Sequence, residues 1–208
     1  MGRIADEHVE WAVVNRLKAM LDEPPKTRFN VTQSFALFTA VLVWTKNRIW
    51  VGGDREDRPA WFGGEDHAAR DMRERLQNTC ICDAPWRLSL TPPQIVMLDG
   101  QQPFLARINS DFAEMSAEAF FRWLRNALAH GDGRTIRPIH KPSQGGDKTL
   151  LAGFEVAERR GADHLYHADM RRIGATLADL FCQSLSGGDR YFEREAGTAT
   201  IEEGARVA

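Results

Sequence analysis

The sequence predicts a mainly α-helical domain in which a small β-hairpin precedes the last helix. Two observations predict this fold class. Apolar residues recur at helical spacing in most of five stretches that proline or glycine separate. An alternating, strand-like pattern on either side of a turn-rich segment comes before the last of these stretches.

Two helices are predicted before residue 52, and only the second is apolar enough to form the centre of a bundle. The first runs from about residue 4 to 21 and ends before Pro24 and Pro25. The second runs from about residue 32 to 51 and is apolar nearly all round, which predicts a central position.

Residues 52–103 are interpreted as an insertion. A polar helix is expected from about residue 65 to 78, on the surface, with Met72 and Leu76 as its few apolar anchors. The rest of this segment is not assigned, because Pro85 and the Pro92-Pro93 pair interrupt any long element.

The fourth predicted helix starts near Ser116, a good N-cap residue, and ends at about residue 129, before Gly131. Its apolar residues recur at helical spacing and predict a buried face: Phe120, Phe121, Leu124, Ala127 and Leu128.

Two extended stretches, 135–141 and 149–158, flank a turn-rich segment and predict the hairpin. The last helix is expected from about residue 168 to 185. We therefore expect a single domain over residues 1–188 and a charged tail over residues 189–208.

The composition indicates a soluble globular protein. Apolar residues make up 43% and charged residues 27% of the chain, and the formal net charge is −2, so any basic surface is local. The longest apolar run, residues 34–44, is too short to cross a membrane. Without an apolar leader near the start, we expect a cytoplasmic protein with reduced thiols.

The cysteines give little support for a metal. Cys80 and Cys82 lack the usual two-residue gap of zinc ligand pairs, although His164 and His167 could add ligands. We predict no metal and no cofactor.

The residues best suited to catalysis lie on the fourth helix, opposite its apolar face. Arg122, Arg125 and Asn126 lie there, and His130 stands at the helix end. Arginine has a planar fork of donors that suits phosphate, and histidine exchanges protons near neutral pH. Arg125 and His130 are five residues apart, so they can converge only where the helix ends and Gly131 lets the chain turn.

Such a pair can cleave RNA without metal, because one group can deprotonate the ribose 2′-hydroxyl while another stabilises the phosphate. Residues 119–148 hold six basic and two acidic side chains, 6 − 2 = +4, which favours an anionic ligand. Within this segment we expect Arg122, Arg134 and Arg137 to bind the substrate.

The segment from Phe120 to Gly131, FFRWLRNALAHG, resembles the signature of the HEPN superfamily (higher eukaryotes and prokaryotes nucleotide-binding). That signature is an arginine, four to six residues, then a histidine, commonly with a polar residue directly after the arginine. Arg125, Asn126 and His130 match it. The strand region and the final helix that follow the motif are similar to those of plasmid and defence-associated bacterial members.

The resemblance implies a four-helix bundle that dimerises with its motifs facing each other. It also implies a metal-independent endoribonuclease that acts as a toxin or antiviral effector, in some cases with a cognate antitoxin. Arg125, Asn126 and His130 would then be the catalytic residues. The length of residues 52–103 departs from a minimal HEPN domain.

Other interpretations stay open. The domain could bind RNA or nucleotides, or act as an adaptor, without cleaving, or it could be a purely structural helical partner protein. Arg125 could simply pair with a carboxylate and His130 could simply cap the helix, because a cation suits a helix C-terminus. His140 is expected on the surface, and the spacing of Arg125 and His130 alone is weak evidence.

Overall fold

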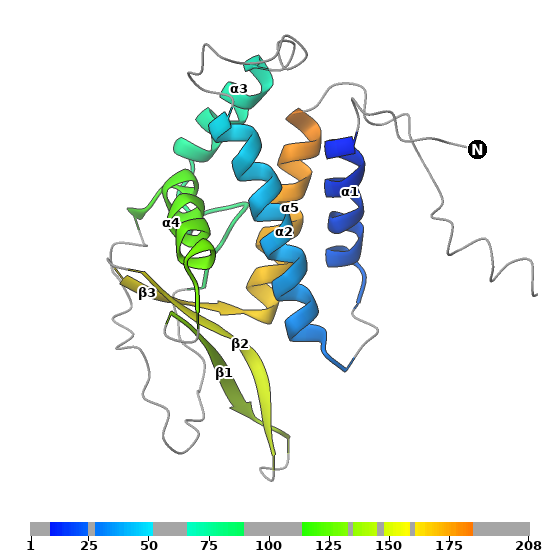
Figure 1. Ribbon diagram of the computed structural model, residues 1–208, viewed down its shortest axis with the longest axis vertical. Helices are drawn as coiled ribbons and strands as arrows, with labels where there is room; N and C mark the ends of the chain where they lie inside the picture. Colours follow the sequence, from blue (N-terminus) through cyan, green and yellow to red (C-terminus); the bar gives the residue numbers. More distant parts are fainter. Residues whose placement is uncertain are drawn as a thin grey trace, which may run out of the picture.

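The computed structural model describes residues 9–24, 28–51, 66–89, 114–132, 135–144, 148–158 and 161–184. These residues form five helices and three strands (Figure 1). The helices are α1 (Val9–Asp22), α2 (Asn30–Val51), α3 (Asp66–Gln77), α4 (Ala117–Ala129) and α5 (His167–Ser184). The strands are β1 (Ile136–Pro142), β2 (Thr149–Glu158) and β3 (Gly161–Tyr166). The mainly α-helical class is confirmed. The bounds agree with the predicted ones within two residues, except that residues 4–8 of the first predicted helix lie outside the described residues.

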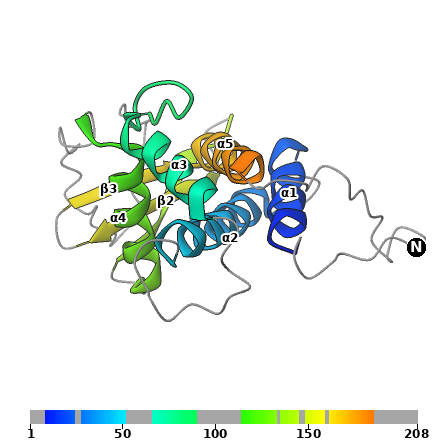
Figure 2. The ribbon, with the colours of Figure 1, turned by 90° about the horizontal axis from the view of Figure 1, so that it is seen from above.

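Helix α2 occupies the centre, as its all-round apolar character predicts. It packs against α1 and α5 on one side and against α4 on the other, which is visible when the molecule is seen from above (Figure 2). Phe38 and Val41 of α2 are fully buried. Gly174 of α5 allows a close approach, since a Cβ there would lie 2.9 Å from Leu21 Cδ1 and 3.1 Å from Phe38 Cδ2.

The sheet has three antiparallel strands in the order β1-β2-β3, not the two of the predicted hairpin. The strands predicted at 135–141 and 149–158 are confirmed as β1 and β2. The prediction missed β3, which pairs with β2 from Gly153 opposite Tyr166 to Glu158 opposite Gly161. Its sequence, GADHLY, is poor in strand-forming residues, so pairing with β2 sets its conformation.

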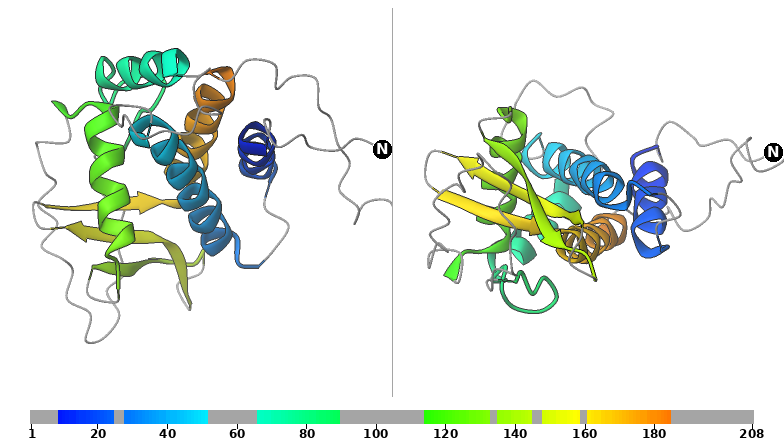
Figure 3. Two further views of the ribbon diagram at one scale, coloured as in Figure 1. Left: turned by 45° about the horizontal axis from the view of Figure 1, so that its top comes forward. Right: turned by 90° about the horizontal axis from the view of Figure 1, so that it is seen from below.

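The sheet lies at one end of the helices, and α4 crosses it (Figure 3). Phe154 of β2 stacks on Phe35 of α2 with ring centroids 4.3 Å apart, and Val156 is fully buried. Leu150 alternates with Phe154 and Val156 along β2, yet it is 47% exposed, because it lies near the β1–β2 turn.

Part of the predicted insertion belongs to the core. Met72 and Leu76 anchor α3, each 1% exposed, as the sequence suggests for a surface helix. The strap, which we define as residues 79–89, follows α3 and buries Ile81 and Trp86 among the core residues. Residues 66–89 therefore stabilise the bundle and are more than an appendage to it.

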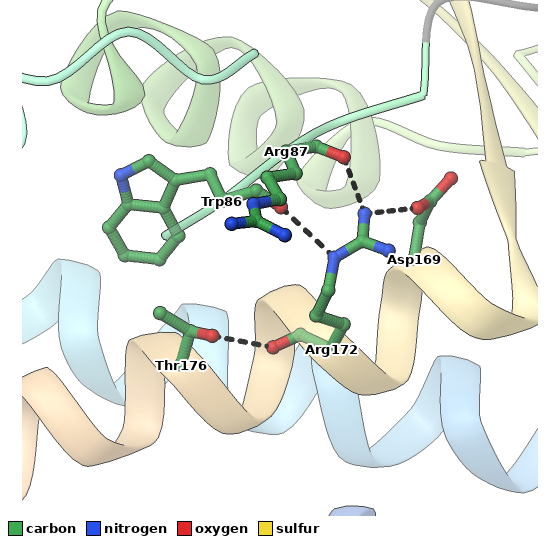
Figure 4. A network of polar contacts seen from close by, with 5 residues as sticks. All are labelled: Trp86, Arg87, Asp169, Arg172 and Thr176. Carbon is green, nitrogen blue, oxygen red and sulfur yellow. Dashed lines mark hydrogen bonds and ion pairs between the residues drawn. The ribbon is translucent and has the colours of Figure 1, made fainter. Parts of the chain in front are cut away.

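An arginine of α5 holds the strap in place (Figure 4). Arg172 donates from Nε to the carbonyl oxygen of Trp86 at 3.1 Å and from Nη2 to that of Arg87 at 2.6 Å. It also forms an ion pair with the buried Asp169, which accepts a further hydrogen bond from the Ser89 backbone. Burial raises the pKa of Asp169 above its ordinary value, although Arg172 and the hydrogen bonds oppose this.

None of the helices in the described ranges has the length and apolar character that crossing a membrane requires.

Candidate active site on helix α4

Helix α4 begins as its sequence predicts. The Ser116 side chain accepts a hydrogen bond from the Ala119 backbone N–H at 3.2 Å, the N-cap interaction. The strap fixes this start, because Ala117 N donates to Thr79 O at 2.8 Å. The predicted buried face is confirmed, apart from Leu128, which is only partly buried: Phe120, Phe121, Leu124 and Ala127 are all within 2% of full burial.

The opposite side of α4 brings Arg125 and Asn126 together with a residue that the sequence analysis missed. Arg125 Nη1 donates to Asn126 Oδ1 at 3.2 Å, and Lys46 Nζ of α2 donates to the same oxygen at 3.4 Å. Arg125 and Asn126 are half-buried. One amide oxygen thus holds two cations side by side, and we refer to Lys46, Arg122, Arg125, Asn126 and Glu118 as the α4 cluster.

Asn126 keeps its amide nitrogen for another partner. Because both cations occupy Oδ1, the Nδ2 group faces away from them, and it donates no hydrogen bond to any residue of the described ranges. The remaining donors of the Arg125 guanidinium are likewise without an acceptor there. The cluster therefore offers several N–H groups to a ligand oxygen.

The cations of the cluster influence one another. Partial burial lowers the pKa of Lys46 below its ordinary value, and the charges of Arg125 and Arg122 lower it further, while Glu118 raises it. Lysine next to two guanidinium groups is electrostatically unfavourable in an empty cluster, and a bound anion would relieve that repulsion.

Glu118 balances only part of this charge. Its carboxylate lies 3.6 Å from Arg122 Nη2, and its side chain is 5% exposed, whereas that of Arg122 is 53% exposed. Its second oxygen, Oε1, is buried without a hydrogen-bond partner. With three cations and one carboxylate, the net charge of the cluster is 3 − 1 = +2.

His130 is at the C-cap of α4, one residue beyond its last helical residue, as predicted. Its backbone N–H donates to Asn126 O at 3.1 Å, and its backbone angles, φ −104° and ψ 6°, stay near the helical turn. The imidazole is exposed and forms no hydrogen bond with any described residue, Arg125 and Asn126 included. Within one chain, Arg125 is hydrogen-bonded to Asn126, but neither side chain is hydrogen-bonded to the His130 ring.

Gly131 has a different role from the expected one. It was expected to let the backbone turn, yet its φ lies outside the left-handed range. What requires glycine is space, because a Cβ at this position would lie 2.4 Å from Ile136 Cδ1 and 3.0 Å from the Ala127 carbonyl oxygen. Close packing of β1 against the end of α4 therefore fixes the place of His130.

The other basic residues predicted to bind substrate are less well placed by the structure. Arg137 lies on β1 and is half-buried, and Arg134 lies outside the described residues. His140, expected on the surface, is half-buried, and its Nδ1 is buried without a partner.

The three cysteines are free thiols. Burial raises the pKa of Cys182 to about 12, so this thiol is protonated at neutral pH. In the ranges that the structure describes, no three potential metal ligands of the His, Cys, Asp and Glu types are grouped together.

Lys46 was missed because its partner in the cluster is far away in the sequence. It lies 80 residues from Asn126, and only the packing of α2 on α4 brings the two together. One signal was present: Lys46 is one of only two cations, with Arg48, on the long apolar helix α2, and it directly follows the buried Thr45. A charge in such a position usually has a specific partner.

Comparison of the chain with protein-family models, with curated proteins and with solved structures found no match.

Proposed function

We propose that this protein is a metal-independent endoribonuclease of the HEPN type that acts as a homodimer. One observation supports the proposal most strongly. Two cations converge on Asn126 at the end of α4 where an exposed imidazole follows, in a cluster with a net charge of +2. A phosphodiester is the anion that fits such a group of N–H donors beside a proton-transfer residue.

Arg125 and Asn126 bind the scissile phosphate in this proposal. The guanidinium donates to the non-bridging oxygens and stabilises the charge that develops on them in the transition state. Asn126 donates from Nδ2 to the same phosphate, since Arg125 and Lys46 occupy its oxygen. Lys46 is a positioning residue that also adds positive charge, and Arg122, Arg134 and Arg137 steer RNA towards the cluster.

His130 moves the protons. As a neutral imidazole it takes the proton of the ribose 2′-hydroxyl, and the 2′-oxygen then attacks the phosphorus. The P–O bond to the 5′-oxygen of the next nucleotide breaks, and that oxygen takes a proton from protonated His130, which returns the imidazole to its neutral form. The products are a 2′,3′-cyclic phosphate and a free 5′-hydroxyl, so no metal and no water molecule is consumed. DNA lacks the attacking group.

A second copy of the chain would join the two halves of the site. His130 is exposed and forms no hydrogen bond within its own described chain, so it is free to face Arg125 of another protomer. A two-fold pair of α4 ends would present two arginines and two histidines to one RNA strand. The resemblance of residues 120–131 to the HEPN signature favours this arrangement, a four-helix bundle core and a role in cytoplasmic toxin or antiviral systems, with a possible cognate antitoxin.

The test is cleavage of a labelled single-stranded RNA in the presence of EDTA. We expect wild-type protein to give 2′,3′-cyclic phosphate ends. His130→Ala and Arg125→Ala should each lower the rate by about 10²- to 10³-fold while the circular dichroism spectrum and the melting temperature stay unchanged. Arg70→Ala, an exposed arginine on α3, is the matched control and should retain full activity.

Mixing the two inactive variants tests the composite site. If each active site pairs Arg125 of one protomer with His130 of the other, a randomly exchanged mixture regains about a quarter of the wild-type activity. Wild-type protein without RNase activity at any RNA sequence, or full activity in either single variant, contradicts the proposal.

A second candidate is a binding module that holds RNA or nucleotides, or acts as an adaptor, without cleaving. The lack of a hydrogen bond between the His130 ring and Arg125 in one protomer favours it. It predicts that RNA binds in a salt-dependent manner and is recovered intact, and that His130→Ala leaves its affinity unchanged, whereas Arg125→Ala weakens it.

A further inference from the structure

A second cavity with cationic walls lies far from the α4 cluster. It has a volume of about 380 Å³ and is bounded by the start of α2, by the far end of the β1–β2 hairpin and by the first residue of α5. Its distance from the α4 cluster follows from helix geometry: Val31 lines the cavity and Lys46 belongs to the cluster, so the two regions are about 22 Å apart along the axis of α2.

The basic groups of this cavity come from three separate elements. Arg28 lies just before α2, Lys141 is on β1 and His167 begins α5. No described residue that lines the cavity carries a carboxylate. The first turn of α2 lines the same cavity, and the N-terminus of a helix attracts anions, although Asn30 Oδ1 already accepts from the Val31 N–H.

His167 has an unmet bonding capacity at this place. Its Nε2 is buried and has no hydrogen-bond partner among the described residues, and leaving a buried polar atom without a partner costs free energy. Burial lowers the pKa of His167, and the charges of Arg171 and Lys141 lower it further. An anion in the cavity would offset the positive charge of Lys141 next to this ring.

The apolar side of the cavity is unusually open. Phe29 is 60% exposed and Leu150 is 47% exposed, and both line the cavity. The Arg28 guanidinium lies over the Phe29 ring, 4.9 Å from its centroid, so the aromatic face and the cation form one surface. Such a surface accepts a flat apolar group next to a negative charge.

We propose that this cavity binds a small organic phosphate, a phosphate monoester with a flat apolar body. The phosphate faces Lys141, His167 and the start of α2, and the apolar body packs on Phe29 and Leu150. Two cations, Arg28 and Lys141, lie beside the His167 ring with no carboxylate among the lining residues, and this favours a dianion over a carboxylate ligand, which carries one charge. The volume lies within the range of small-molecule sites. This binding site is independent of the proposed ribonuclease activity.

The 208-residue chain is titrated with phenyl phosphate by isothermal calorimetry, and inorganic phosphate, benzoate and phenol serve as comparison ligands. We expect saturable binding of phenyl phosphate with a Kd of about 1 mM or tighter. Inorganic phosphate and benzoate should bind about tenfold more weakly, and phenol should not bind. Benzoate binding as tightly as phenyl phosphate, or no saturable binding of phenyl phosphate, overturns the proposal.

Variants locate the bound molecule. Lys141→Gln should weaken phenyl phosphate binding about tenfold, because it removes a charged hydrogen-bond donor. Lys148→Gln is the matched control: it removes the same charge from the same hairpin but lies outside the cavity, so affinity should change less than about twofold.

Phe29→Ala separates the two halves of the ligand. It should weaken phenyl phosphate and leave inorganic phosphate unchanged, and its exposure makes unfolding of the variant unexpected. Arg70→Ala, an exposed arginine of α3 outside both the cavity and the α4 cluster, should leave phenyl phosphate binding unchanged even if the protein proves to have no ribonuclease activity. Equal losses with Lys141→Gln and Lys148→Gln, or loss of binding in Arg70→Ala, contradict the assignment.

Discussion

Arg125 and Arg172 are two arginines in one small fold with opposite surroundings. Arg172 donates to two strap carbonyl oxygens and to the carboxylate of Asp169, which is 3% exposed (Figure 4). Arg125 donates only to Asn126 among the described residues. A guanidinium that donates three hydrogen bonds to acceptors of the same chain stabilises the fold, whereas one that donates a single bond keeps most of its donors for a ligand.

The charge balance around the two arginines differs in the same sense. Arg172 faces a buried carboxylate, so its charge is matched. Arg125 lies near Lys46 and Arg122, and Glu118 is the carboxylate that opposes them. Uncompensated like charges lower stability, and departures of this kind from well-matched packing are expected at functional sites.

The largest effect that would test this comparison is on stability. Arg172→Ala leaves Asp169 buried without its cation and removes both bonds to the strap, so we expect the free energy of unfolding to fall by about 3 kcal/mol. Urea denaturation followed by tryptophan fluorescence measures it, and Trp86 in the strap should report the loss.

Arg125→Ala is the matched variant for that measurement. It removes an arginine from the same fold but breaks only the bond to Asn126 and relieves repulsion with Lys46, so we expect a change below about 0.5 kcal/mol. Equal destabilisation by the two substitutions would break the distinction between a structural and a functional arginine.

The next effect concerns the close packing that fixes the open end of α4. Gly131→Ala places a methyl group against Ile136 Cδ1 and the Ala127 carbonyl, so we expect a loss of about 1 kcal/mol in thermal unfolding experiments. Ile136→Val removes the nearest methyl group, and the same glycine substitution in that background should cost less. No difference between the two backgrounds would mean that another contact limits the position.

A smaller effect would sharpen the electrostatic half of the comparison. Glu118→Gln removes the buried carboxylate of the α4 cluster and raises its net charge from +2 to +3. We expect RNA affinity to rise about threefold at low salt and the gain to shrink at high salt, measured by fluorescence anisotropy. Glu114→Gln, an exposed carboxylate just before α4, is the control. Weaker binding by Glu118→Gln would show that the carboxylate organises the cluster instead of opposing the ligand.

The parts of this fold that depend on local patterns could be predicted from the sequence. Helix α4 is an example, because the Ser116 side chain caps its own helix and the apolar residues that follow recur at helical spacing. Arg125 and Asn126 are neighbours in sequence, so their contact also follows from local geometry. The burial of the strap could not be predicted, because Ile81 and Trp86 lie in a proline-interrupted segment without a periodic pattern.

What the sequence could not reveal depends on contacts between distant segments. Lys46 reaches Asn126 only because α2 packs on α4, and β3 is a strand because β2 offers it an edge. In the sequence, Arg172 is indistinguishable from other charged residues on an amphipathic helix, and only the folded structure shows its hydrogen bond to the strap. Local periodicity carries no information about which of several arginines will meet a carbonyl oxygen 85 residues away.

The smallest predicted effect is the pH dependence that Asp169 gives to the structural region. Burial raises the pKa of this carboxyl group in the folded state, so between its unfolded value of about 3.8 and that higher pKa the folded state binds more protons than the unfolded state. The contribution of Asp169 to stability is therefore most favourable below pH 3.8 and declines as the pH rises through the folded pKa.

Asp169→Asn isolates this contribution, because the variant keeps the shape of the side chain and cannot titrate. We expect the difference in unfolding free energy, wild type minus variant, to fall as the pH rises from about 3.8, and to level off above the folded pKa. Urea denaturation at closely spaced pH values measures it. A difference that rises with pH would mean that the ion pair with Arg172 outweighs burial, and that the pKa of Asp169 is lowered in the folded protein.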